Sequence, residues 1–212
     1  MNPYVSPSPC VHMVDDEAAV RDALTFLMRS HGLSVSSYAS GPEFLSHLAL
    51  QPVRGCIVLD VRMEPLSGLQ VFDELRLRGV TLPVLFLSGH GDIPMVVDAL
   101  QKGAVDFLEK PFSGDHLVQR VQRALGMEAE QFATTTEQAL TLRRLRALTS
   151  RERAVMRLVA AGKLNKVIAD ELCIAVRTVE AHRSRVFEKL QLRSAAELAT
   201  LLAGVPENLS DK

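Results

Sequence analysis

The sequence predicts an α/β domain with a doubly wound parallel sheet, followed by a smaller all-α domain. Up to about residue 125, short apolar runs alternate with helical patterns, which is typical of βαβ units. From 147 to 205, four short helical patterns replace the apolar runs. Charge divides in the same way, with a net of −4 over residues 1–125 and +4 over residues 147–205. This asymmetry favours a cation site in the first part and a polyanion partner for the second.

Four apolar runs are the predicted strands of the sheet. They cover residues 11–14, 56–59, 84–87 and 104–108. Helical patterns lie between and after them, with apolar faces near residues 20–28, 44–48, 69–75, 96–100 and 117–125. Alternation of strands and helices predicts a parallel sheet with helices on both faces.

Polar side chains stand where the predicted strands end. Asp15 and Asp16 follow the first run and Asp60 follows the second, while Ser88 ends the third and Lys110 comes after the fourth. Because the carboxyl edge of an open parallel sheet is where such folds place their chemistry, we expect these side chains to converge. Taken alone, Asp60 is equally well explained as a strand end that faces water. Five suitable residues at four strand ends make that interpretation far weaker.

These residue types suit phosphoryl transfer. Clustered carboxylates raise one another's pKa, and Mg²⁺ relieves the repulsion while it takes one or two carboxylates and keeps several waters. One carboxylate can then attack phosphorus, which forms an aspartyl phosphate. Lys110 would supply a second cation for the phosphoryl oxygens, and Ser88 a hydrogen-bond donor. The pattern predicts phosphorylation of Asp60, with Mg²⁺ as the cofactor.

Residues 10 to about 125 resemble the receiver domain of two-component response regulators. The stretches that carry the resemblance are Val14–Glu17, Val58–Met63, Leu87–Asp92 and Phe107–Phe112, and Ser88–Met95 is similar to the FixJ subgroup. The resemblance implies a flavodoxin-like (CheY-like) fold with a five-stranded parallel sheet. The chain departs from the family at Met63-Glu64-Pro65, where the family often reads Met-Pro-Gly, so Glu64 adds a carboxylate near the site.

The resemblance also implies a role for each matching residue. The roles are phosphoacceptor for Asp60, Mg²⁺ ligands for Asp15, Asp16, Asp60 and the backbone carbonyl of Arg62, and phosphate binding or switching for Ser88, Phe107 and Lys110. In this family the peptide bond before Pro111 is usually cis, a form that only X-Pro bonds adopt readily. That geometry is expected to direct the lysine to the site.

The basic module from 147 to 205 has the pattern of a helix-turn-helix. Thr149 and Glu152 form a predicted capping box before its first helix, which stops at Gly162. Two short helices joined by a turn at 173–175 follow, and the second of them is basic on its open face. On charge alone, a solvated basic face on a small helical bundle is the better interpretation.

Three stretches of this module are similar to the LuxR-type DNA-binding domain, namely Leu148–Glu152, Asn165–Ala169 and Thr178–Arg183. The resemblance implies base contacts for Glu180, Ala181 and Ser184, and phosphate or flanking contacts for Lys166, Thr178, Arg183, Arg185 and Lys189. Glu180 has two interpretations of equal weight, a hydrogen bond from cytosine or pairing with a neighbour on its own helix. The last helix, 194–203, is implied to form the dimer contact, although core packing also explains its leucines.

Four segments are therefore expected. They are a receiver domain at 1–125, a helical linker at 126–146, a LuxR-type helix-turn-helix DNA-binding domain at 147–205 and a tail at 206–212. The linker is rich in helix formers, and any break is expected near its three threonines at 134–136. Three widely spaced cysteines favour reduced thiols in a cytoplasmic protein, and the sequence shows neither a signal-peptide pattern nor a membrane-spanning run.

We expect a phosphorylation-activated transcriptional response regulator and not an enzyme. The expected partners are a sensor histidine kinase, double-stranded promoter DNA, RNA polymerase and a second copy of the chain on activation. The enzyme alternative is an aspartyl-phosphate hydrolase, which would carry an acid at position 62, where this chain has Arg62. A degenerate receiver would lack some of the five site residues, and a small-molecule sensor would need an apolar cavity in place of the acid cluster.

Overall fold

The structure is a computed structural model that describes residues 7–89 and 93–204. The chain divides into two compact units, Met1–Phe132 and Ala133–Lys212, which are described separately. The expected tail at 206–212 and the loop at 90–92, part of the stretch similar to the FixJ subgroup, lie outside the described residues. Within the described ranges, no helix is both long and apolar enough to cross a membrane.

Five parallel strands form the sheet of the first unit, in the order β2-β1-β3-β4-β5. They are β1 (Cys10–Val14), β2 (Val35–Tyr38), β3 (Gly55–Asp60), β4 (Val84–Ser88) and β5 (Asp106–Glu109). Four of them correspond to the predicted apolar runs, and the predicted fold class is confirmed. The apolar runs do not reveal β2, because this edge strand contains two serines among its four residues.

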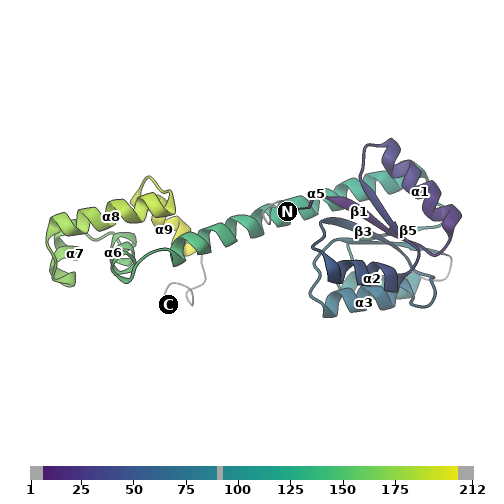
Figure 1. Cartoon of the computed structure of the whole chain (residues 1–212), viewed down its shortest axis with the longest axis horizontal. Coiled ribbons are helices and arrows are strands. Elements are labelled where there is room, and N and C mark those ends of the chain that lie inside the picture. Colours follow the sequence, from purple (N-terminus) through teal and green to yellow (C-terminus); the bar gives the residue numbers. More distant parts are fainter. Residues whose placement is uncertain (1–6, 90–92, 205–212) are drawn as a thin grey trace. The chain divides into compact units, whose positions relative to one another are not determined.

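Helices cover both faces of this sheet. Figure 1 shows α1 (Ala18–Ser30) and α5 (Gly114–Arg146) on one side, with α2 (Gly41–Leu50) and α3 (Gly68–Leu77) on the other. The helix α4 (Ile93–Gln101) adds to the core beneath α2 and α3. Along β3, Cys56 and Val58 belong to the α1–α5 core, whereas Ile57 and Leu59 belong to the opposite core. A central strand buried on both faces must be apolar throughout, which explains this run.

The helix α5 continues without interruption through the stretch that was expected to be a helical linker. It therefore has no break at the three threonines. Its middle is tied to the sheet of the first unit by Arg54, whose Nε and Nη2 donate to Glu128 at 2.9 and 3.1 Å. The Arg54 guanidinium carbon also lies 3.5 Å from the centre of the Phe132 ring. Contacts of the first unit consequently reach Phe132, past the expected receiver boundary at residue 125.

Four helices build the second unit around one apolar core. They are α6 (Ser150–Ala160), α7 (Asn165–Leu172), α8 (Val176–Leu190) and α9 (Ala195–Ala203). The predicted capping box is confirmed, since Thr149 Oγ1 accepts from the Glu152 N–H at 3.3 Å and Glu152 Oε2 accepts from the Thr149 N–H at 2.8 Å. The turn between α7 and α8 passes through Cys173 in a left-handed conformation (φ 52°), which gives the tight helix-turn-helix connection.

Candidate functional site

The carboxyl ends of the parallel strands bring the predicted acids and the predicted lysine together. Lys110 Nζ lies 2.6 Å from Asp60 Oδ1 and 3.5 Å from Asp15 Oδ2. The N–H of Arg62 donates to the other oxygen of Asp60 at 2.8 Å. Because β1 pairs with β3 so that Val14 stands beside Leu59, the residues that follow them meet at the same edge. A single lysine therefore bridges carboxylates from two neighbouring strands.

The two acids after β1 have different environments. Asp15 is buried, and its Oδ1 accepts from the N–H of Glu17 at 2.9 Å. Its Oδ2 accepts no hydrogen bond from any described residue. Asp16 is exposed, and its Oδ2 accepts from the N–H of Glu64 at 3.2 Å. Arg21, which the sequence patterns did not indicate, donates to the backbone carbonyl of Asp15 at 2.7 Å and so braces this strand end.

The three charged groups shift one another's pKa. Burial raises the pKa of the Asp60 carboxyl above its usual range, while the hydrogen bond and charge of Lys110 oppose this rise. Burial likewise raises the pKa of Asp15 against the charge of the same lysine. Burial alone would lower the pKa of the Lys110 ammonium, but its hydrogen bond to Asp60 and the charges of both carboxylates raise it. Lys110 therefore stays charged at neutral pH and favours the ionised form of both acids.

A hydroxyl and an aromatic ring complete the predicted set. Ser88 is fully buried at the end of β4, and its Oγ has no hydrogen-bond partner among the described residues. The backbone N–H of Lys110 donates to the carbonyl of Ser88 at 2.8 Å, which ties the two strand ends together. Phe107 is half-buried on β5 and packs against the α2–α4 core. The peptide bond before Pro111 is cis, as the resemblance implies, and the Glu64–Pro65 bond is cis as well.

A glycine closes the loop that follows Asp60. The N–H of Gly68 donates to the carbonyl of Val61 at 3.0 Å, and a Cβ at Gly68 would lie only 2.1 Å from the carbonyl oxygen of Asp60. A side chain there would force the loop away from the carboxylate, so the site depends on this close approach. The sequence patterns did not indicate Gly68, although its place after the N-cap residue Ser67 was a usable signal.

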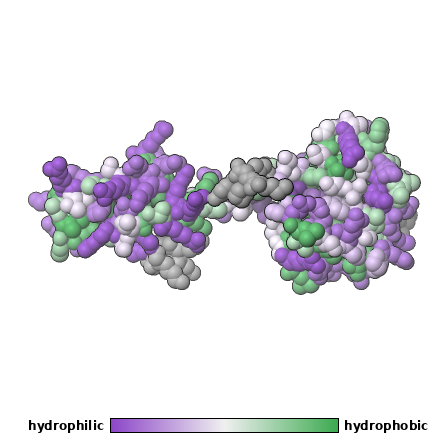
Figure 2. Space-filling view, viewed as in Figure 1, coloured by the Kyte–Doolittle hydropathy of each residue, from purple (hydrophilic) through white to green (hydrophobic). Residues whose placement is uncertain are grey.

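The predicted DNA-contact residues lie on α7 and α8 of the second unit. Lys166, Thr178, Glu180, Ala181, Ser184 and Arg185 are exposed, while Arg183 and Lys189 are half-buried. Figure 2 shows hydrophilic atoms over most of the visible surface of this unit. Of the two interpretations of Glu180, local pairing is not observed, since in the described part of the chain Glu180 pairs with neither Arg183 nor Ser184.

The two half-buried cations are already engaged within the unit. Lys189 Nζ donates to Glu152 Oε2 at 2.7 Å and to the carbonyl of Ala147 at 3.2 Å. Burial would raise the pKa of the Glu152 carboxyl, but the hydrogen bonds from Lys189 and from the capping residue Thr149 lower it below its usual value. Arg183 Nη1 donates to the side-chain oxygen of Asn165 at 3.0 Å. Lys189 therefore ties the end of α8 to α6, while Arg183 joins α8 to α7.

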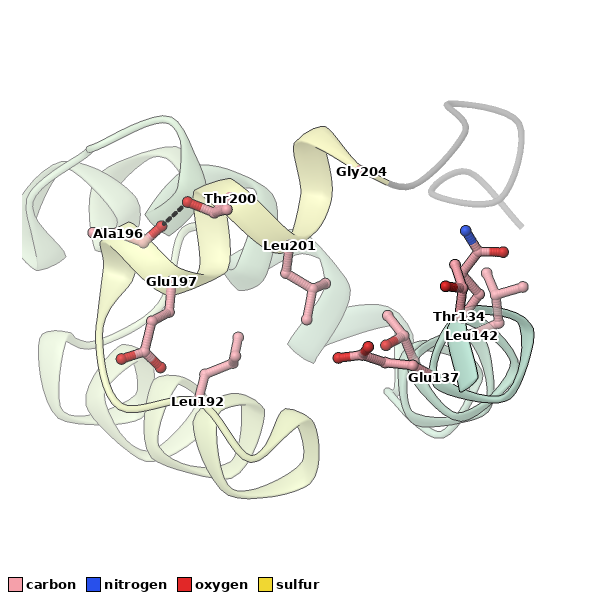
Figure 3. Close-up of a pocket in the computed structure, with 11 residues that line it drawn as sticks. Thr134, Glu137, Leu142, Leu192, Ala196, Glu197, Thr200, Leu201 and Gly204 are labelled. Carbon is pink, nitrogen blue, oxygen red and sulfur yellow. Dashed lines mark hydrogen bonds between the residues drawn. The ribbon is translucent and has the colours of Figure 1, made fainter. Parts of the chain in front are cut away.

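A groove of about 840 Å³ lies between the last part of α5 and α9. Figure 3 shows Leu192 and Leu201 on one side of it, with Leu142 and Glu137 on the other. Thr200 also lines this groove, and its hydroxyl donates to the carbonyl of Ala196 at 3.1 Å, within α9. The helix expected to form a dimer contact thus borders a concave surface that is mainly apolar, with the carboxylates of Glu137 and Glu197 also in its lining.

The two parts of the chain match two different protein families. Residues 11–122 match the family described as response regulator receiver domain, and residues 146–202 match the bacterial regulatory proteins of the luxR family. The fold and the two matches define the class as receiver proteins with a LuxR-type DNA-binding domain.

Relatives of nearly full length extend this result. The transcriptional regulatory protein FixJ of Azorhizobium caulinodans is 43% identical, with 92% of this chain and 93% of its own length covered. The tetrathionate response regulatory protein TtrR of Salmonella typhimurium is 44% identical, with 89% of each chain covered. The structure of the response regulator StyR matches with a TM-score of 0.87 and 37% identity, over 94% of this chain and 100% of that one. The chain belongs to the response regulators of two-component systems, and it is a transcriptional regulatory protein.

Proposed function

We propose that a sensor histidine kinase phosphorylates this protein on Asp60. The observation that carries the proposal is the Lys110 ammonium, 2.6 Å from the Asp60 carboxylate at the edge of the parallel sheet. A carboxylate must be ionised to attack phosphorus, and the lysine favours that form against the cost of burial. The same ammonium can then bind an oxygen of the transferred group, and the buried Ser88 hydroxyl can donate to another.

Mg²⁺ is the proposed cofactor, with Asp15, Asp16, Asp60 and the carbonyl of Arg62 as the residues that would hold it. The buried Asp15 Oδ2 fits this role, because it accepts no hydrogen bond from the described residues and has only the charge of Lys110, 3.5 Å away, to compensate it there. Within the described residues no three acidic, histidine or cysteine side chains form a ready cage. Mg²⁺ does not require one, since it usually keeps several waters and takes only one or two carboxylates. When bound, it would supply charge neutralisation for the phosphoryl oxygens.

The phosphoacceptor assignment can be tested with full-length protein and acetyl phosphate in the presence of Mg²⁺. The Asp60→Asn variant is expected to lose the acid-stable, base-labile label, because an amide cannot form the acyl phosphate. Asp73→Asn, which changes an exposed acid on α3, is the matched control and should label like the wild type. Full labelling of the Asp60→Asn variant at this site would refute the assignment.

We further propose that α8 is the recognition helix for promoter DNA. Glu180, Ala181 and Ser184 would face base edges, while Lys166, Thr178, Arg183, Arg185 and Lys189 would contact or flank the phosphates. The exposure of the first three on one helix and the net charge of +4 over residues 147–205 support this proposal. Binding should weaken steeply with salt, and Ala181→Lys should change which sequence is preferred, whereas Lys166→Gln should weaken all sequences alike. Binding without salt dependence would contradict the proposal.

Activation would join two copies of the chain. Ser88 and Phe107 would shift toward the phosphoryl group, the surface near α4 and β5 would change, and a second copy would cover the apolar groove beside α9.

The proposed division is a receiver domain at 1–125, a helical linker at 126–146, a DNA-binding domain at 147–205 and a tail at 206–212. In this role the chain is a cytoplasmic regulator that acts with RNA polymerase, and not an enzyme.

A further inference from the structure

Arg183 is held in place by two groups on different helices. Its Nη1 donates to Asn165 Oδ1 at 3.0 Å, and its guanidinium carbon lies 5.5 Å from the centre of the Phe187 ring. Asn165 is the first residue of α7, whereas Arg183 and Phe187 stand in consecutive turns of α8. The guanidinium is therefore oriented by an amide oxygen and by an aromatic face together.

Asn165 is available for this contact because it does not cap its own helix. Asparagine at a helix start commonly accepts from backbone N–H groups as the N-cap residue. In α7 the N-cap residue is Leu164, which makes no side-chain cap, and Asn165 occupies the next position. Its amide oxygen is turned to Arg183 instead. This acceptor is neutral, so it orients the guanidinium without cancelling its charge.

Two neighbouring cations of the second unit, in contrast, are each neutralised by a carboxylate. Lys189 is paired with the carboxylate of Glu152 at 2.7 Å, and Lys163 is paired with that of Glu171 at 2.5 Å. Arg183 has no carboxylate partner within the described part of the chain. It lines a hollow of about 440 Å³ together with Lys163 and Asn165. A cation that is oriented but not neutralised remains available for an anion that approaches this hollow.

We propose that Asn165 is a positioning residue for DNA binding, whose amide oxygen holds the Arg183 guanidinium ready for a DNA phosphate. The inference rests on the proposed DNA-binding function. It adds Asn165, which is not among the proposed DNA-contact residues. A side chain that is already ordered loses less conformational freedom on binding. Because the contact is made to a phosphate, its effect is the same for every DNA sequence.

Full-length protein and a mixed-sequence DNA duplex are sufficient to test this role, with affinity measured over a series of salt concentrations. Arg183→Gln should reduce the magnitude of the log–log salt slope by about 0.9, the value for one phosphate contact. Asn165→Ala keeps the cation, so the slope should stay unchanged while affinity falls by about threefold to tenfold. Asn165→Asp should instead reduce the slope as Arg183→Gln does, because the new carboxylate neutralises the guanidinium.

The double variant separates positioning from a general structural effect. In the Arg183→Gln background, Asn165→Ala should cause no further loss of affinity, because there is no guanidinium left to orient. An equal loss in both backgrounds would overturn the proposal, and so would an unchanged salt slope in Arg183→Gln. If Asn165→Ala disturbs folding, Arg183→Lys provides a second test. It keeps the positive charge, so the salt slope should stay at the wild-type value.

Lys163→Met is the matched control. It removes a cation from the same hollow, and Glu171 already neutralises that cation in the wild type. Its effect on the slope should be clearly smaller than that of Arg183→Gln. Thermal unfolding of each variant should show that the second unit remains folded. Wild-type protein that does not bind the duplex would refute the DNA-binding function itself. Salt-dependent wild-type binding with no coupling between positions 165 and 183 would refute only the present inference.

Discussion

Lys110 bridges two buried carboxylates at the end of the parallel strands, and this arrangement sets the chemistry of all three groups. Its ammonium favours the ionised form of Asp60, which the attack on phosphorus requires. The same positive charge stands close to the oxygens of Asp15 and Asp60 that would hold a metal ion. In the proposed function Lys110 would therefore support phosphoryl transfer but oppose the binding of Mg²⁺ to the unphosphorylated site.

Lys110→Met should accordingly change metal binding and phosphorylation in opposite directions. Without the competing ammonium, the affinity for Mg²⁺ should rise several-fold, since two carboxylates then lack a counter-charge. The rate of labelling by acetyl phosphate should fall by about tenfold or more, because one cation on the phosphoryl oxygens is lost. Calorimetric titration with Mg²⁺ and a labelling time course would measure the two effects. Lys102→Met, which removes an exposed lysine in the turn directly after α4, should change neither quantity.

His12 is a buried titratable group at the centre of β1. Its Nδ1 lies 3.2 Å from the Tyr38 hydroxyl and its Nε2 lies 3.3 Å from the carbonyl of Arg54. Burial lowers the pKa of the imidazole below its ordinary value, His47 lowers it further, and the hydrogen bond to Arg54 opposes the change. Folding therefore favours the neutral ring. This contribution to stability is complete above pH 6.5 and decreases as the pH falls below that value.

His12→Gln should reduce the pH dependence of the unfolding free energy in this range. Urea unfolding of the wild type should show stability falling with pH below 6.5, by at most about 1.4 kcal/mol per pH unit for one proton. The variant should lack that part of the slope, because glutamine does not titrate. Identical slopes in wild type and His12→Gln would show that His12 titrates alike in both states.

At the scale of a helix, α5 is attached to the first unit well beyond the sheet core. The bidentate pair between Arg54 and Glu128 has side chains that are only 16% and 7% exposed, so neither charge is well solvated without the other. The ring of Phe132 covers the guanidinium from a position four residues further along the helix. We call these two contacts of Arg54 the clamp. The clamp fixes residues 126–132 of α5, a segment with too few apolar residues to be held by apolar packing alone.

Glu128→Gln should loosen this segment of α5. Removing one partner of a largely buried ion pair leaves the other charge uncompensated, so we expect a loss of about 2–4 kcal/mol in unfolding free energy. Amide hydrogen exchange should become faster between residues 126 and 132 and stay unchanged in β3. Glu74→Gln is the control, because its pair with Arg78 is about 40% exposed on both sides and should contribute little. Wild-type exchange rates in the Glu128→Gln variant would rule out the clamp.

At the scale of the whole molecule, one phosphoryl group must alter how the chain binds DNA. A phosphorylation switch needs the modified receiver to favour its active state by a few kcal/mol. Coupling two DNA-binding modules in a dimer converts that preference into a large change in affinity, since the second half-site is bound at a high effective concentration. The apolar groove beside α9 is the surface we assign to the second copy.

Thr200→Arg should separate phosphorylation from dimer formation. The exposed Thr200 lines the groove, and the longer arginine side chain would fill the concave surface that a second copy would occupy. Labelling by acetyl phosphate should be unchanged, while sedimentation should show a monomer under conditions in which the phosphorylated wild type is a dimer. Affinity for DNA with paired half-sites should fall by about a hundredfold. Thr81→Arg, which changes an exposed threonine before β4, is a suitable control, and normal dimerisation of Thr200→Arg would exclude the groove as the contact surface.

The fold class and the grouping of charged residues around Asp60 were predictable because short-range patterns mark the strands and their ends. Apolar runs mark strands that are buried on both faces, and parallel strands necessarily place their carboxyl ends at one edge. Asp15, Asp60 and Lys110 could therefore be grouped before any contact was known. The capping box of Thr149 and Glu152 was predictable for a similar reason, because its two hydrogen bonds join residues three positions apart.

Other features were decided by tertiary structure alone. The edge strand β2 has no apolar run, and it is defined by pairing with β1. Gly68 is required by its approach to the carbonyl of Asp60, and the contacts of Arg54 with Glu128 and of Asn165 with Arg183 join residues 74 and 18 positions apart. Such contacts leave no periodic mark in the sequence. They depend on how the helices and strands pack. The residue at one position does not reveal which distant residue the packing will bring beside it.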